Sequence, residues 1–152
     1  MPITIRPFLW FDNRAAEAHA FYTRVFNSVD GTSDIVAPGT GGPFMGSVSL
    51  PGIELMLFDG GPHVSFNDAI SLFVSVETQE EVDRLWEALS EGGAPGRCGW
   101  ITDQFGVRWQ IVPTALGELM GSGDQARSMA VRDAMMTMGK LDIAALREAF
   151  ER

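Results

Sequence analysis

The chain has 152 residues and a formal net charge of −9, because 20 Asp and Glu side chains stand against 11 Lys and Arg. This acidic balance argues against binding to nucleic acid or to an anionic membrane surface, since both depend on clusters of basic side chains. The length predicts a single domain, and the hydrophobic content of 45% is sufficient for a folded core.

The first elements are predicted from an apolar run and from a helical period. Ile3–Phe11 is rich in β-branched and aromatic residues, which is typical of a buried strand. A helix is expected over Arg14–Asn27, because apolar residues recur there at three- and four-residue spacing. Either Asp12 or Asn13 is expected to cap this helix, since a short side-chain oxygen can accept a hydrogen bond from a first-turn amide.

A loop and two strands follow. The Gly- and Pro-rich stretch Ser28–Pro43 is expected to be a loop that contains a short strand near Ser33–Val36. Strands are predicted over Phe44–Leu50 and Ile53–Phe58, because the Pro51-Gly52 dipeptide between them favours a tight turn.

The same order of elements is then predicted a second time. Asp68–Val76 is expected to be a strand, and Thr78 with Glu81 three residues later forms a capping-box pattern at the start of a helix. Strands over Cys98–Thr102 and Val107–Val112 complete the series. The two helices align at an offset of 64 positions, which favours an internal duplication: Phe21 with Leu85, Tyr22 with Trp86 and Val25 with Leu89.

The C-terminal segment is predicted to be helical. A short helix is expected over Ala115–Met120 and a second over Gln125–Met138, and Asp142 is expected to cap a third that ends near Phe150. The apolar, Met-bearing faces of these helices must be buried, either against the chain's own sheet or against a partner subunit.

A metal centre built by paired strand–helix–strand modules needs three or four His, Glu, Asp or Gln donors from different strands. The chain has only two histidines. No preformed metal site and no cofactor are therefore expected. A divalent metal held by some combination of the polar residues on or beside strands is the fallback: Glu54, Asp59, His63 and Gln110.

The single cysteine, Cys98, favours a reducing compartment, and we expect it to be a small buried hydrophobe in a strand rather than a nucleophile. The sequence contains no GxSxG elbow and no phosphate-binding Gly-rich loop. It also shows no targeting segment and no apolar run long enough to span a membrane, so we expect a cytoplasmic protein.

Aromatic residues give the positive signal for ligand binding. Most should be absorbed by the core, but those on the free face of a curved sheet would line an apolar pocket. Strand alternation places Arg108, Gln110 and Val112 on one face, opposite Trp109 and Ile111. The candidate cavity residues are Phe58, His63, Trp100, Arg108 and Gln110.

Five segments carry a resemblance to a known family: CGWITDQFGVRWQIVPTALGELM, ITIRPFLWFD near the start, FYTRVF in the first helix, FDGGPHVSFNDAISLFVSVETQEEVDRLWEALSEGG in the middle and KLDIAALREAF at the end. Together they resemble the PhnB-like family, often labelled 3-demethylubiquinone-9 3-methyltransferase-like. That family belongs to the vicinal oxygen chelate (glyoxalase/bleomycin-resistance) superfamily, and the resemblance extends over nearly the whole chain.

The resemblance implies an α+β fold in which paired βαβββ modules form an open eight-stranded barrel, usually completed in a homodimer. We accordingly expect one domain over residues 1–152, with modules at about 1–61 and 66–113 and a C-terminal helical tail over 114–152. The donor positions of metal-dependent members fall here near four places, of which at most two could donate: Ile5 or Arg6, Phe58 or Asp59, Ile70 or Ser71, and Gln110. The Gly-rich loop that S-adenosylmethionine binding calls for is not present in the sequence.

These observations favour a homodimeric protein of unassigned reaction that binds a small apolar or aromatic molecule in the barrel cavity. One alternative is a divalent-metal-dependent lyase, isomerase or dioxygenase of the glyoxalase type, with ligands from one or both subunits. Another is a non-catalytic, drug-sequestering dimer of the resistance type.

Overall fold

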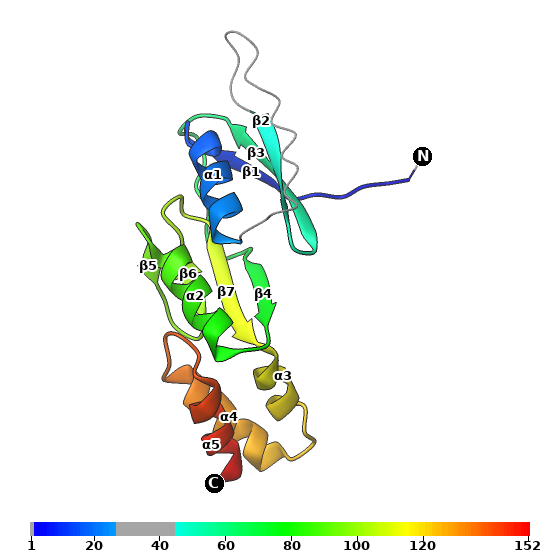
Figure 1. Cartoon of the computed structure of the whole chain (residues 1–152), viewed down its shortest axis with the longest axis vertical. Helices are drawn as coiled ribbons and strands as arrows, with labels where there is room; N and C mark the ends of the chain where they lie inside the picture. Colours follow the sequence, from blue (N-terminus) through cyan, green and yellow to red (C-terminus); the bar gives the residue numbers. More distant parts are fainter. Residues whose placement is uncertain (1, 27–44) are drawn as a thin grey trace. The chain divides into compact units, whose positions relative to one another are not determined.

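The computed structural model describes residues 2–26 and 45–152. The chain divides into two compact units, Met1–Ser65 (unit 1) and Phe66–Arg152 (unit 2). Each unit combines a sheet with helices, which confirms the predicted α+β class (Figure 1). The strand predicted near Ser33–Val36 lies outside the described residues, and no helix in the described part of the chain is long and apolar enough to cross a bilayer.

Unit 1 has a three-stranded sheet with one face covered by a helix. β1 (Phe8–Phe11) pairs in parallel with β3 (Ile53–Asp59), and β2 (Met45–Leu50) pairs with β3 in antiparallel, which places β3 in the centre. Helix α1 (Ala15–Val25) packs on β2 and β3. The side chains that alternate away from α1 form the free face of this sheet.

The beginning of unit 1 differs from the predictions. β1 begins at Phe8 rather than at Ile3, because its pairing with β3 begins there, and Ile3 remains 92% exposed. Neither Asp12 nor Asn13 caps α1; the N-cap residue is Arg14, whose side chain makes no cap hydrogen bond.

The first turn of α1 is capped from a distant strand instead. The Oδ1 atom of Asp59, at the end of β3, accepts a hydrogen bond of 2.8 Å from the Ala15 amide. The prediction that Asp12 or Asn13 caps the helix is therefore wrong, because a residue distant in the sequence supplies the acceptor.

Helix α1 contains a buried histidine. His19 is 7% exposed, and its Nε2 atom has no hydrogen-bond partner among the described residues. Burial lowers the pKa of His19 below its ordinary value of 6.5, and a hydrogen bond with the backbone of Ser47 offsets only part of that shift.

We expect the free energy of unfolding to fall as the pH is lowered below about 6.5, because there the unfolded chain binds a proton at His19 more readily than the folded chain does. Urea titrations between about pH 5 and about pH 7.5 would measure this slope. His19→Gln should flatten the slope, whereas the matched variant His63→Gln, in an exposed loop, should retain it. An equal slope in both variants would contradict the assignment to His19.

Unit 2 has a four-stranded sheet in the order β4-β7-β6-β5. β4 (Leu72–Val76) pairs with β7 (Arg108–Pro113) in parallel, whereas β6 (Trp100–Thr102) is antiparallel to β7 and β5 (Ala94–Pro95) is antiparallel to β6. Helix α2 (Gln79–Ser90) lies against β5, β6 and β7 on one face of the sheet (Figure 1).

Local predictions in unit 2 are partly confirmed. The capping box is present, since the Thr78 side chain accepts from the Glu81 amide and the Glu81 side chain accepts from the Thr78 amide. β4 begins at Leu72 rather than Asp68, because Asn67 Oδ1 accepts from the Ala69 amide and closes a turn there. The two-residue strand β5 was not predicted.

The two units share one pairing pattern. In each unit the first strand leads into a helix and then pairs in parallel with the last strand, β1 with β3 and β4 with β7. The helix residues that align at the offset of 64 are buried in both units at two of the positions: Phe21 and Leu85, and Val25 and Leu89.

Three helices follow β7: α3 (Thr114–Met120), α4 (Gln125–Met136) and α5 (Ile143–Glu151). They gather at the end of β7 (Figure 1) around a cluster of buried residues: Val112, Leu116, Val131, Leu141 and Leu146. The predicted cap of the last helix is confirmed, because Asp142 accepts from the Ala145 amide. The Gln79 side chain joins α2 to this group, since it donates to the Leu141 carbonyl and accepts from the Ile143 amide.

Candidate functional site

The free face of the unit 2 sheet carries a row of three side chains. Gln110 in the central strand β7 is paired in register with Phe73 of β4 on one side and with Trp100 of β6 on the other. The neighbouring Trp109 is only 2% exposed, because alternation turns it to the opposite, helix-covered face. The prediction that Gln110 and Trp109 face opposite ways is thereby confirmed.

A cavity of about 480 Å³ lies over this row. The sheet contributes Phe73, Trp100 and Gln110 to its lining, and the C-terminal helices contribute the facing wall: Leu116, Gly117, Glu118 and Met120 from α3 and Met135 from α4. The lining is therefore mostly apolar with a few polar groups, the usual composition of a site for a small organic molecule.

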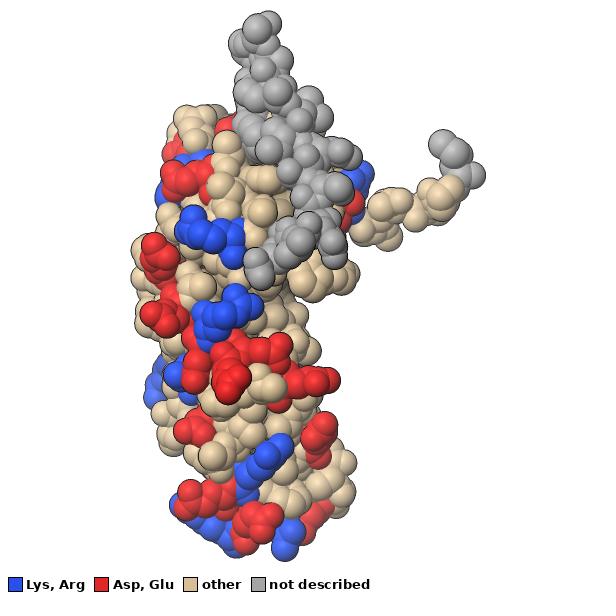
Figure 2. All heavy atoms as spheres, in the orientation of Figure 1, with Lys and Arg blue, Asp and Glu red and all other residues tan. Residues whose placement is uncertain are grey.

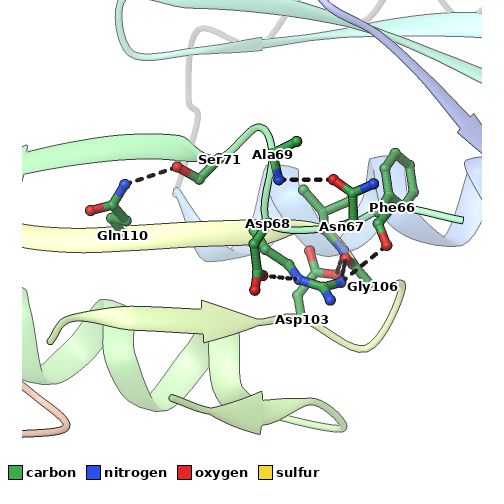
Figure 3. A network of polar contacts seen from close by, with 10 residues as sticks. Phe66, Asn67, Asp68, Ala69, Ser71, Asp103, Gly106 and Gln110 are labelled. Atoms are coloured by element: carbon green, nitrogen blue, oxygen red, sulfur yellow. Dashed lines mark hydrogen bonds and ion pairs between the residues drawn. The ribbon is translucent and has the colours of Figure 1, made fainter. Parts of the chain in front are cut away.

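Gln110 is the polar group at the centre of the row. Its Nε2 atom donates a hydrogen bond of 2.9 Å to the Ser71 hydroxyl (Figure 3), which restrains the orientation of the side chain. A hydroxyl can donate as well as accept, so either end of the amide can pair with Ser71 and leave the other end for a ligand.

The candidate Arg108 has another role. Its Nε atom donates to Asp68 Oδ1 at 2.7 Å, and its Nη1 atom donates to the carbonyl oxygens of Gly106 at 2.6 Å and Phe66 at 3.4 Å. These bonds hold the segment before β4 against the sheet (Figure 3), and Arg108 is not among the residues that line the cavity.

The turn between β6 and β7 is organised by a buried carboxylate that the sequence analysis did not single out. Asp103 is 2% exposed. Its Oδ1 atom accepts from the amides of Phe105 (2.9 Å) and Val107 (3.0 Å), and its Oδ2 atom accepts from Trp109 Nε1 (2.8 Å). Asp103 is thus bound on both oxygens, which assigns it a structural role beneath the site.

The other two candidate cavity residues belong to unit 1. Phe58 lies on the free face of that sheet, where its ring centroid is 5.4 Å from those of Phe8 and Trp10. His63 lies in an exposed loop after β3. Of the five predicted cavity residues, the structure places Trp100 and Gln110 in one cavity.

The fallback metal ligands do not fit a metal centre. Glu54 and Asp59 lie five positions apart in β3 and so point to opposite faces of the sheet. Each also has another partner, since Glu54 Oε1 is 3.2 Å from Arg6 Nη1 and Asp59 caps α1. The described residues contain no group of three or more His, Cys, Asp and Glu that could hold a metal ion.

Cys98 was predicted to be buried in a strand, and this is wrong. It lies in the turn before β6 with φ at 56°, is half-buried and lines the cavity, with its Sγ atom 3.9 Å from Met136 Sδ. Phe73 and the wall residues were not predicted from the sequence. Alternation puts Phe73 on one face of its strand, but only the register of β4 with β7 places it beside Gln110, and no local signal shows which residues α3 turns toward the sheet.

The charge around the cavity comes from one residue. Of the lining residues within 2–26 and 45–152, Glu118 is the only charged one, and none is Lys or Arg. Elsewhere, acidic and basic side chains are interspersed on the face shown in Figure 2.

The similarity to known proteins extends over the part of the chain that forms the two sheets. Residues 3–112 match the model of a family described as 3-demethylubiquinone-9 3-methyltransferase. A putative 3-demethylubiquinone-9 3-methyltransferase, PhnB protein, from Bacillus cereus is 32% identical; the match covers 73% of this chain and 99% of that one, with a TM-score of 0.60.

Two more distant structures share the fold. Protein PA1353 from Pseudomonas aeruginosa is 24% identical, with coverage of 74% of this chain and 98% of that chain and a TM-score of 0.60. The fosfomycin resistance protein FosX from Listeria monocytogenes, complexed with Mn(II) and sulfate, is 13% identical, with coverage of 73% and 91% and a TM-score of 0.56. The comparison with curated proteins gives no match.

Proposed function

The chain belongs to the 3-demethylubiquinone-9 3-methyltransferase family of PhnB-like proteins, in the vicinal oxygen chelate superfamily, and from this membership we propose that it binds a small apolar or aromatic molecule. The observation that supports the proposal is the cavity of about 480 Å³ over the row of Phe73, Gln110 and Trp100. Its volume lies within the range of about 300 to 1,000 Å³ that is usual for small-molecule sites.

The lining suggests how such a molecule would be held. The rings of Trp100 and Phe73 offer flat apolar surface, and Phe73 is 60% exposed. Gln110 supplies a hydrogen-bonding group between the two rings, which would orient a ligand that carries one polar substituent. Glu54 and Asp59, two of the fallback metal ligands, already have other partners, so they give the metal-dependent alternative no support.

Trp100→Ala should weaken the binding of a neutral aromatic probe, 9-anthracenemethanol, by about tenfold or more, because a stacked indole contributes about 1–3 kcal/mol through burial and ring contact. Isothermal titration calorimetry of the full chain would measure the affinity. Trp86→Ala is the matched control, since Trp86 is also half-buried but lies in α2, outside the cavity lining. Equal affinity in Trp100→Ala and the parent, or no binding by the parent, would overturn the proposal.

We also propose that the protein acts as the homodimer that the family resemblance implies, with the cytoplasm as its compartment. Light scattering at micromolar concentration would test the assembly: a mass of 16.5 kDa, that of one chain, would exclude the dimer.

A further inference from the structure

We propose that the α3 wall makes this cavity selective for organic cations, so that its occupant is an aromatic or alicyclic amine whose ammonium group lies toward Glu118. This inference rests on the binding function proposed above and adds to it the charge class of the ligand.

Glu118 provides the first argument. Among the described residues it is the only charged side chain in the cavity lining, and it forms no ion pair with any basic residue in that part of the chain. An ammonium group near it would gain an attractive partner. A carboxylate or phosphonate would meet this like charge, and the lining residues that the structure describes include no Lys or Arg to compensate for it.

The sheet side of the cavity has the same preference. The faces of Trp100 and Phe73 carry negative electrostatic potential and attract a cation that lies over them. The amide oxygen of Gln110 adds a further hydrogen-bond acceptor to the sheet side of the lining. The net charge of −9 adds a weak attraction for cations over the whole surface.

The packing of α3 holds the backbone that carries Glu118, whereas the Glu118 side chain itself is exposed. Leu116, two residues earlier, is buried in the cluster with Val112 and Leu141, and this anchors the helix to the end of β7. Backbone bonds from Cys98 to the Met138 carbonyl (2.8 Å) and from Gly99 to the Gly139 carbonyl (2.9 Å) hold the following segment to the sheet.

The wall also lies outside the residues that match the family model. The family match ends at residue 112, and α3 begins at Thr114. The charge preference is therefore a property of the C-terminal segment of this chain, added to a sheet face that the matched region supplies.

Three probes with the same three-ring body test the proposal: 9-(aminomethyl)anthracene, 9-anthracenemethanol and 9-anthracenecarboxylate, titrated calorimetrically into the full chain at neutral pH. We expect the cation to bind about tenfold more tightly than the anion, with the alcohol between them, because the exposed Glu118 charge acts favourably on one probe and unfavourably on the other. Glu118→Gln should remove most of this difference, and Glu118→Lys should reverse the order.

Glu87→Lys is the matched control. Glu87 lies on the exposed surface of α2, outside the cavity lining, and its replacement changes the net charge by the same amount. The order of the three probes should therefore be retained in this variant. Circular dichroism would show whether each variant is folded. If Glu118→Lys does not fold, the result is decided by Glu118→Gln alone.

The outcomes separate the two proposals. Equal binding of the three probes, or a preference for the cation that survives in Glu118→Gln, would overturn the charge selectivity and leave the binding function intact. Failure of all three probes to bind would overturn the binding function itself, and the charge selectivity with it.

Discussion

Replacing Asp103 by alanine is expected to lower the free energy of unfolding by about 3–5 kcal/mol, because three donors would lose the buried carboxylate that accepts from them. The amides of Phe105 and Val107 and the Nε1 atom of Trp109 all donate to this carboxylate, which is 2% exposed. An unsatisfied buried donor costs about 1–3 kcal/mol, so the sum is large for a single side chain.

Guanidinium denaturation followed by far-ultraviolet circular dichroism would measure the loss. Asp103→Asn should be intermediate, since an amide keeps one acceptor oxygen but turns a donor toward either the turn amides or Trp109. Asp133→Ala, at an exposed position in α4, is the control and should change the stability by no more than about 0.5 kcal/mol. A loss below about 1 kcal/mol in Asp103→Ala would show that water or a shifted turn replaces the carboxylate.

Gly99→Ala is expected to destabilise the fold by about 2–4 kcal/mol for two reasons that add together. The φ angle of Gly99 is 84°, a conformation that L side chains rarely adopt. A Cβ atom there would also lie 2.8 Å from the Ile111 carbonyl oxygen, so the turn before β6 would have to move away from β7.

Gly123→Ala separates the two causes. Gly123 has a similar φ of 88°, but a Cβ atom there would meet no other atom within 4 Å. It should therefore cost only the backbone strain of about 1–2 kcal/mol. Because the Gly99 amide donates to Gly139, Gly99→Ala should also loosen the C-terminal segment and weaken the binding of 9-anthracenemethanol. Equal losses of stability in the two variants would contradict the close approach at Gly99.

The features that could be predicted from the sequence are those determined by neighbouring residues. The capping box of Thr78 and Glu81 and the cap at Asp142 each depend on residues three apart, and both are present. The separation of Gln110 from Trp109 follows from strand alternation alone.

The features that could not be predicted depend on contacts between distant parts of the chain. The acceptor for the first turn of α1 is Asp59, which lies 44 positions away from Ala15. Arg108 faces the expected side of β7, but the Asp68 carboxylate and the Phe66 carbonyl bind its guanidinium, so it is not available to the cavity. Glu118 and Met135 line the cavity only because the C-terminal helices fold back on β7, which the period of an isolated helix does not indicate.

The parallel pairing of first and last strands also sets the order in which each unit can fold. β4 has β7 as its only neighbour in the described sheet, and β1 has only β3, so each first strand stays unpaired until the last strand of its unit has been synthesised. Helix α2, with its local capping box, can form earlier, because its hydrogen bonds join residues that leave the ribosome together. Each unit is therefore completed late, when its first and last strands pair and the chain between them loses the entropy of an open loop in one step. Until β7 has paired with it, the edge of β4 is open to association with other chains.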